Sequence, residues 1–315
     1  MLCYADVKKI LTAVQLPNIY KKERFIYMWL AKDWKDYRLI DAADGEKLEF
    51  WGEYLLRRPE PQAVWGKNEK SGLWERADAH YHRSSSGGGS WEFKNKRLPE
   101  RWTVSYKSLT FNIKPMGFKH TGLFPEQAVN WDWFCGLIKN AGRPVRVLNL
   151  FAYTGGATVA ALSAGAEVVH VDASKGMVTW AKENVLSSGL GDKSVRYIVD
   201  DVKKFVMREI RRNREYDAVI MDPPSYGRGP SGELWRIEDE LYPLVCSCTE
   251  LLSDNPLFFL INSYTTGLCA TVLKNILRTT LEEKYGGTID AQEIGIPPES
   301  SPLILPCGIS ARWSR

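Results

Sequence analysis

From Val145 to the end of the chain, short aliphatic runs alternate with segments of helical spacing. One such helical segment is 175–188, which Gly189 ends. Strands that alternate with helices of this length predict a doubly wound, mostly parallel α/β sheet of the Rossmann-like type. We expect seven strands, the last two forming an antiparallel edge hairpin: 145–150, 167–172, 195–199, 217–222, 256–262, 288–294 and 303–312.

The first hundred or so residues have a different pattern, rich in Trp and Tyr. Around the dipeptide Asp44-Gly45, a typical hairpin turn, apolar residues alternate with polar ones. A Ser/Gly stretch at 83–93 predicts a mobile loop, and a helix is expected at 127–140. We therefore predict a β-rich accessory domain at 1–112 and the α/β domain at 113–315.

The composition indicates the general class of protein but does not identify its function. The net charge of +4 permits a polyanionic partner without requiring one. No apolar run approaches the roughly 18 residues of a membrane helix, and the first residues lack a secretory pattern, so we expect a cytoplasmic protein. The six cysteines contain no Cys-x-x-Cys pair, and His80 and His82 have no third ligand nearby in the sequence. We therefore predict neither a disulfide framework nor a metal site.

The ends of four predicted strands carry the candidate chemistry, because ligands of doubly wound sheets bind at the carboxyl ends of the strands. The first strand runs into a glycine turn and a small-residue helix, which lets a ligand approach the backbone. An ordinary strand-turn-helix corner is the alternative. The other three strands end in acids. The positions are Gly155-Gly156, Asp172, Asp200-Asp201 and Asp222.

The acid at Asp172 favours a cofactor that contains a nucleoside. It follows the glycine turn at about the spacing at which an acid binds ribose hydroxyls. The turn lacks the GxGxxG spacing of dinucleotide sites, and no GxxxxGK[ST] phosphate loop occurs. S-adenosylmethionine fits this pattern, with its aminoacyl end over the turn, its ribose on Asp172 and its adenine near Asp200 or Asp201. Asp201 also fits a helix N-cap, a role compatible with the first.

The motif DPPSYG begins at Asp222. Pro223 and Pro224 fix the backbone and remove two N–H donors, so the aspartate is held rigidly at the sheet edge. Such a loop can accept a hydrogen bond from an amine or hold a base beside a methyl donor, and Tyr226 can stack on that base. A simple proline turn that ends a strand is the alternative interpretation.

Together these motifs resemble class I S-adenosylmethionine-dependent methyltransferases, and within them the group that modifies large-subunit ribosomal RNA. FAYTGGATV resembles the glycine motif of that group, HVDAS its ribose-binding acid, VDDV its adenine-side acid and DPPSYG its DPP motif. KHTGLFPEQ, at 119–127, resembles the segment that closes over the cofactor. The resemblance implies a methyltransferase that acts on RNA. It also implies cofactor contacts from Lys119, Thr121, Phe151, Tyr153, Gly155, Asp172, Asp201 and Asp222, and their neighbours Thr154, Gly156, Ala173 and Asp200 complete the predicted cofactor site.

One position departs from the cytosine C5 enzymes of this group, which attack the ring with a cysteine. Here Tyr264 stands where those relatives carry that cysteine, and Cys269 fits a packed helix thiol better than a nucleophile. We therefore favour a ring or exocyclic nitrogen of a ribosomal RNA base as the acceptor. Asp222 would orient the cofactor or accept an amine hydrogen. The predicted catalytic residues are Asp222, Pro223, Pro224, Tyr226 and Tyr264.

The basic segments leave the class of substrate open. The segment 203–216 has a cationic helical face, which is more often a solvated surface than an RNA contact. The segment 94–101, beside the Ser/Gly stretch, is a better candidate for reaching RNA. A small-molecule or protein methyltransferase and a non-catalytic RNA-binding or assembly factor that retains the fold are the alternatives. A nucleotide-dependent oxidoreductase is a weaker one.

Overall fold

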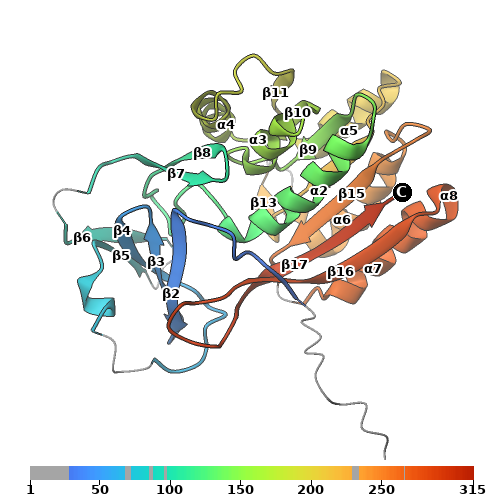
Figure 1. The fold of residues 1–315 in the computed structure, drawn as a ribbon. Helices are drawn as coiled ribbons and strands as arrows, with labels where there is room; N and C mark the ends of the chain where they lie inside the picture. Colours follow the sequence, from blue (N-terminus) through green and yellow to red (C-terminus); the bar gives the residue numbers. More distant parts are fainter. Residues whose placement is uncertain (1–27, 68–71, 85–87, 96–97, 229–233, 266) are drawn as a thin grey trace, which may run out of the picture.

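The computed structural model describes residues 28–67, 72–84, 88–95, 98–228, 234–265 and 267–315. Its larger part is an eight-stranded sheet in the order β1-β16-β17-β15-β12-β9-β10-β11 (Figure 1). The strands from β15 to β11 are parallel, whereas β17 is antiparallel to both of its neighbours. These observations confirm the predicted doubly wound, mostly parallel sheet. The strands are β1 (Met28–Leu30), β9 (Arg146–Leu150), β10 (Glu167–Asp172), β11 (Val195–Val199), β12 (Ala218–Met221), β15 (Phe258–Ser263), β16 (Thr288–Ile296) and β17 (Leu305–Ser314).

The sheet has one strand more than the seven expected from the sequence. The additional strand, β1, precedes the accessory domain in the chain and pairs in parallel with β16. Its three residues are too few to show a strand pattern. The expected pair of strands at the end of the chain is present as β16 and β17, but the hairpin does not stand at the edge: β17 lies between β15 and β16, and β16 lies between β17 and β1.

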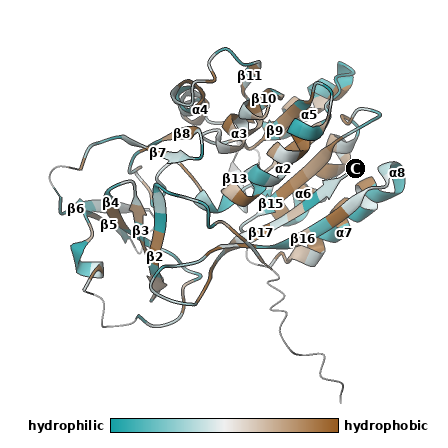
Figure 2. Ribbon diagram, in the orientation of Figure 1, coloured by the Kyte–Doolittle hydropathy of each residue, from teal (hydrophilic) through white to brown (hydrophobic). Residues whose placement is uncertain are grey.

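Helices cover both faces of the large sheet. Alternate side chains of each strand face opposite sides, so that in β9 Val147 belongs to one apolar core whereas Leu148 and Leu150 belong to the other. Figure 2 shows apolar strands beneath helices with hydrophilic outer surfaces. The first face carries α2 (Ala128–Asn140), α3 (Gly156–Ser163) and α4 (Lys175–Ser187). The second carries α5 (Val202–Arg211), α6 (Ile237–Thr249) and α7 (Ala270–Leu277), which continues into η3 (Arg278–Glu282) and α8 (Glu283–Tyr285).

The accessory domain is a five-stranded sheet in chain order, beside the large sheet (Figure 1). The predicted hairpin at Asp44-Gly45 is confirmed, and both residues have positive φ angles, 51° and 74°. The strands are β2 (Tyr37–Ala43), β3 (Glu46–Trp51), β4 (Tyr54–Pro59), β5 (Ala79–Arg83) and β6 (Gly89–Phe93), with η1 (Trp74–Arg76) between β4 and β5. A separate hairpin follows, of β7 (Trp102–Tyr106) and β8 (Leu109–Ile113).

The predicted domain boundary at residue 112 falls inside β8, which is packed against the α/β domain. The Asn112 amide N–H and Nδ2 donate to Oδ1 of Asn184 in α4, at 2.8 and 3.0 Å. The Trp180 indole, also on α4, donates to the Asn112 carbonyl at 3.0 Å. A continuous apolar core runs from β2 and β3 through this hairpin to α2 and β9. The two sheets are therefore parts of one packed body.

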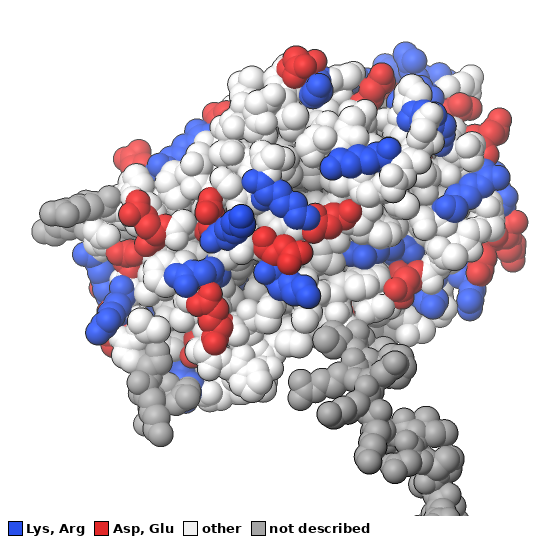
Figure 3. Space-filling view, in the orientation of Figure 1, with Lys and Arg blue, Asp and Glu red and all other residues white. Residues whose placement is uncertain are grey.

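Parts of two segments singled out in the sequence lie outside the described residues. These are 85–87 of the Ser/Gly stretch and 96–97 of the neighbouring basic segment. On the face seen in Figure 3, basic and acidic side chains are interspersed and form no broad patch of one sign. Among the described residues, no helix combines the length and the apolar character needed to cross a bilayer.

A glycine fixes the segment that enters α2 against α4. Gly122 has a φ of +99°, and a Cβ there would overlap the Trp180 ring. We expect Gly122→Ala to lower the free energy of unfolding by about 2–4 kcal/mol, because it adds overpacking to a strained φ. The matched control is Gly117→Ala in the same segment, where a Cβ meets no atom within 4 Å. Urea unfolding of both variants measures the difference, and equal stabilities would contradict this packing.

Candidate active site

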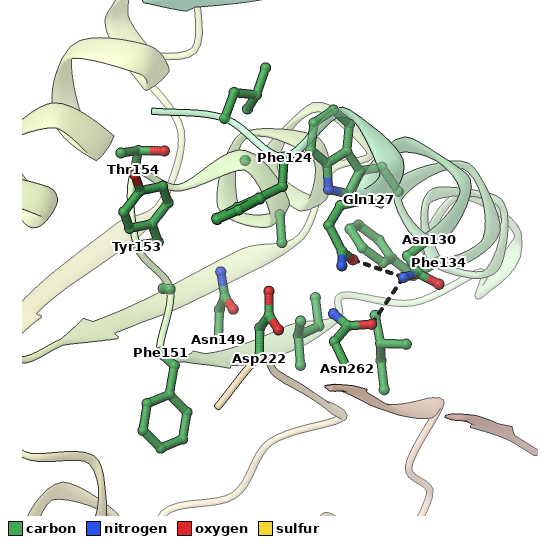
Figure 4. Close-up of a pocket in the computed structure, with 17 residues that line it drawn as sticks. Phe124, Gln127, Asn130, Phe134, Asn149, Phe151, Tyr153, Thr154, Asp222 and Asn262 are labelled. Atoms are coloured by element: carbon green, nitrogen blue, oxygen red, sulfur yellow. Dashed lines mark hydrogen bonds between the residues drawn. The ribbon is translucent and has the colours of Figure 1, made fainter. Parts of the chain in front are cut away.

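The carboxyl ends of β9, β10, β12 and β15 open into a cavity of about 630 Å³ that lies between the two sheets. A narrower pocket of about 50 Å³ continues from it toward α2 and α3 (Figure 4). The large sheet and its loops supply most of the cavity wall. The accessory sheet contributes Lys47, Arg58, Pro59 and Glu60.

The glycine turn after β9 is held in an unusual backbone conformation. Phe151 and Tyr153 have φ angles of 54° and 50°, and Gly155 has a φ of 82°. A Cβ on Gly155 would approach the Ala181 Cβ of α4 to 2.8 Å, so only glycine fits between the turn and this helix. Residues of the turn thereby line the cavities: Phe151 and Tyr153 line both, and Thr154 and Gly156 line the narrower pocket.

The carboxylate of Asp172 is fixed beside this turn. The Tyr153 amide donates to Oδ2 and the Ser174 amide to Oδ1, both at 2.8 Å. Burial raises the pKa of Asp172, while the two amides act in the opposite direction. Each carboxylate oxygen has a second lone pair, so the group can also accept hydrogen bonds from adjacent hydroxyls in the cavity. Its neighbour Ala173 lines the cavity as well.

Of the paired acids after β11, only Asp201 reaches the cavity. Its carboxylate caps α5 by accepting from the Lys204 amide at 2.9 Å, and the residue also lines the cavity. The N-cap role of Asp201 is thus confirmed, and its contact with the adenine stays a prediction. Asp200 is not among the lining residues, and its carboxylate is paired with Arg208.

The DPP loop forms the rim beside these acids. Asp222, Pro223 and Pro224 line the cavity, and burial raises the pKa of Asp222 to about 6. The indole of Trp235 donates to the Pro224 carbonyl at 2.6 Å and lies 5.1 Å from the Phe151 ring. Sequence analysis missed Trp235, because it reaches the loop only when β13 (Tyr226–Arg228) pairs with β14 (Leu234–Arg236).

Tyr226, expected to stack on an acceptor base, is 55% exposed and is not among the cavity-lining residues. Tyr264 does line the cavity, but its hydroxyl donates to Oε1 of Glu60 in the accessory domain at 2.7 Å. Lys47 approaches the other oxygen of Glu60 at 3.2 Å. Tyr264 therefore joins the two sheets across the cavity.

The cysteines of the described chain offer no prepared nucleophile here. Cys269 is not the packed helix thiol expected from the sequence: it is exposed at the N-cap of α7 and is not among the lining residues. Cys307 of β17 lines the cavity but is buried, and burial raises the pKa of its thiol well above the usual range. A thiol in such surroundings stays protonated, whereas a nucleophilic cysteine needs a lowered pKa.

Four residues with side-chain amides line the narrower pocket among mostly apolar neighbours, a feature not predicted from the sequence. Asn130 donates to Gln127 at 2.8 Å and to Asn262 at 3.0 Å, and Figure 4 shows these side chains on the wall of the pocket. Asn149 and Asp222 point into the same pocket from the sheet edge (Figure 4). The sequence signal for this feature is an asparagine near the carboxyl end of each of two buried strands, Asn149 in β9 and Asn262 in β15.

In the segment before α2, Lys119 lines the cavity as expected. Thr121 is fully buried and is not among the lining residues, and its hydroxyl has no hydrogen-bond partner among the described residues.

Three potential metal ligands meet on the accessory sheet, away from this cavity. The ligand atoms of His80, His82 and Glu92 lie within 4.8 Å of one another, and Glu92 is the third group that sequence spacing did not reveal. His80 shares a hydrogen bond with Glu46, and His82 shares one with Glu92, both at 2.8 Å. Each imidazole thus has a carboxylate partner without an ion, and the absence of a metal site stays a prediction.

The sequence of this chain is similar to those of known methyltransferases. The profile described as S-adenosylmethionine-dependent methyltransferase matches residues 75–254. A relative from Shewanella baltica, named ribosomal RNA large subunit methyltransferase K/L, is 30% identical over 258 residues, which is 75% of this chain and 35% of the relative. One of the same name from Methylococcus capsulatus is 28% identical over 66% of this chain and 26% of its own length. The chain thus spans about a quarter to a third of the length of these curated relatives.

Solved structures agree with this match. A SAM-dependent methyltransferase from Agrobacterium tumefaciens superposes with a TM-score of 0.86 at 37% identity, covering 91% of this chain and 93% of that one. A chain described as a methyltransferase complexed with SAH has a TM-score of 0.69 at 17% identity, over 90% of this chain and 76% of its own, and shows the shared fold alone.

The raised pKa of Asp222 predicts that the free energy of unfolding of the unliganded protein depends on pH. An aspartate ionises near pH 4 in the unfolded chain but near pH 6 here, so stability falls as the pH rises through that window. We expect Asp222→Asn to raise the free energy of unfolding by on the order of 2 kcal/mol at pH 8 and to have little effect at pH 4. Urea unfolding at both pH values tests this, with Asp192→Asn on an exposed loop as the control. A loss of stability at pH 8 would refute the assignment.

Proposed function

The chain belongs to the S-adenosylmethionine-dependent methyltransferases, and we propose that it transfers a methyl group to a base of ribosomal RNA. The names of the curated relatives support this acceptor, over the quarter to third of their length that the chain spans. The observation that carries the proposal is the cavity itself, in which the anchored Asp172, the DPP loop and the accessory sheet meet. Residence in the cytoplasm belongs to the same proposal.

The residues of the cavity suit S-adenosylmethionine. Asp172 has lone pairs left for the two hydroxyls of a ribose, since each oxygen accepts only one amide. The side-chain amides of the narrower pocket suit the charged aminoacyl end of the cofactor. We assign Asp201 to the adenine side, where Val202 and Phe151 add apolar surface.

When bound, the cofactor supplies an electrophilic methyl group. The chain's own contribution is to orient the acceptor, and such positioning is worth up to roughly 7–11 kcal/mol of a barrier. Because Pro223 and Pro224 lack N–H groups, the backbone of the loop offers acceptors at these two positions and no donors. Together with the Asp222 carboxylate, such a loop suits an acceptor that carries N–H groups.

A row of aromatic rings leads from the cofactor side of the cavity to the surface. Neighbouring ring centres are 5.5, 5.2 and 5.5 Å apart along Tyr153, Phe124, His120 and Phe118. Phe118 is 42% exposed. Burial, with nearby cations, lowers the pKa of His120 to about 3, so its ring stays neutral. Such rings are suited to stacking with unpaired bases, which supports a nucleic-acid acceptor.

The distribution of surface charge favours recognition of RNA inside the cavity over binding of RNA along a broad basic surface. Lys203, Arg208 and Arg212 of the basic segment at 203–216 are paired with acidic side chains. Acidic and basic groups are also mixed on the face seen in Figure 3. We therefore infer that this segment is a solvated helix face, and that unpaired bases of the RNA are recognised inside the cavity.

The cofactor site predicts a sharp effect at Asp172. We expect Asp172→Ala to weaken binding of S-adenosylhomocysteine at least about 100-fold, because charged hydrogen bonds to two hydroxyls are lost. Isothermal titration calorimetry measures the affinity, with Asp192→Ala as an exposed carboxylate control. If the wild-type protein does not bind S-adenosylhomocysteine, the cofactor assignment is wrong. If the variant binds it with unchanged affinity, Asp172 does not bind the ribose.

The acceptor is tested with labelled S-adenosylmethionine and ribosomal RNA from cells that lack this protein. We expect label in large-subunit RNA, and mass spectrometry of the nucleosides identifies the methylated base. Phe118→Ala should lower kcat/KM for RNA about tenfold, as the loss of one stacked base predicts, and leave S-adenosylhomocysteine affinity unchanged. Label that enters only protein or small-molecule control acceptors would refute the RNA proposal and favour that alternative.

A further inference from the structure

One acidic side chain of the cavity has no role in the site described so far. Glu126 lies in the short turn η2 (Pro125–Gln127) that leads into α2, and it is only 7% exposed. It lines the cavity, on the side where the accessory sheet meets the large sheet. Burying a carboxylate without hydrogen-bond or ionic partners costs free energy.

The neighbouring acids have partners, whereas Glu126 has almost none. Lys47 lies between Glu49 and Glu60, with Nζ 3.5 and 3.2 Å from their nearest carboxylate oxygens. Glu49 also receives Arg58 at 2.7 Å, and Glu60 receives the hydroxyl of Tyr264 at 2.7 Å. Among the described residues, no side chain donates a hydrogen bond to Glu126, whose contact is with its own amide.

The pKa of Glu126 is raised, as expected for a buried carboxyl with few partners. Burial, above all, raises its pKa to about 7, with Glu60 and Asp222 adding to the rise and Lys47 opposing it. A carboxyl poised near neutral pH is suited to accept and release a proton. The charged or titratable residues that line this cavity around Glu126 are Lys47, Arg58, Glu60, Lys119, His120, Tyr153, Asp172, Asp201, Lys203, Asp222, Tyr264 and Cys307.

We propose that Glu126 binds an N–H group of the acceptor base and takes up the proton that this nitrogen loses on methylation. This inference rests on the proposed function. The nitrogen lone pair forms the new N–C bond while the C–S bond breaks, and the electron pair of that bond neutralises the sulfonium. The N–H proton passes to the Glu126 carboxylate and from there to water. The acceptor is therefore a nitrogen that carries hydrogen, such as an exocyclic amine.

Glu126→Gln keeps the shape of the side chain and removes its proton affinity. We expect single-turnover methyl transfer to unmethylated large-subunit ribosomal RNA to fall at least about 100-fold, the lower range for loss of a general base. The wild-type rate should rise with pH through about 7, and this limb should vanish in the variant. Affinities for S-adenosylhomocysteine and RNA should change less than about threefold. Glu126→Asp should recover part of the rate and of the pH limb, which a merely structural role would not do.

The matched control is Glu183→Gln, a surface carboxylate paired with Arg101, and it should match the wild type. Wild-type transfer with unaltered rate and pH profile in Glu126→Gln would overturn the role of Glu126 and leave the proposed function standing. A product methylated at a nitrogen without hydrogen, such as N7 of guanosine, would do the same. No transfer to ribosomal RNA by the wild type would overturn both proposals.

Discussion

The contact between Glu60 and Tyr264 connects the accessory sheet and the large sheet across the cavity. Glu60 belongs to the loop after β4, and Tyr264 follows β15, so one hydrogen bond joins the two sheets over the site. Lys47 approaches the same carboxylate. Buried charged pairs of this kind add little net stability, because desolvation offsets the attraction, but they penalise alternative arrangements of the partners. The cluster therefore acts chiefly to fix the geometry of the site.

The polar interior behind the site follows the same logic. Arg312 of β17 is buried, donates to Oδ1 of Asn130 at 2.7 and 2.9 Å, and lies 3.5 Å from the centre of the Trp29 ring. Asn130 in turn holds Gln127 and Asn262 at the narrower pocket. Side-chain hydrogen bonds thus connect Arg312 of β17, through Asn130 of α2, to the wall of the narrower pocket.

The fold and the half of the site proposed to bind the cofactor were predictable because their signals are local. A glycine turn follows one buried strand and Asp172 ends the next, so the strand pattern alone brings them to one sheet edge. Lys47, Glu60 and Trp235 were not predictable, since each reaches the cavity only through pairing or packing between distant segments. Glu126 stood inside a recognised motif, but its burial comes from the packing of its turn against β16 and α2, which the local sequence does not reveal.

Strand β1 changes what the accessory domain is in terms of chain topology. The chain contributes a strand to the large sheet, leaves to build the five-stranded sheet, and returns through the β7–β8 hairpin. The accessory sheet is thus an insertion between two parts of the α/β domain, β1 and the chain from the β7–β8 hairpin onward. Cutting the chain at residue 113 would remove an edge strand and nearly all of the β7–β8 hairpin along with it. Excision would have to join the chain after Leu30 to the residues before Trp102, leaving both in place.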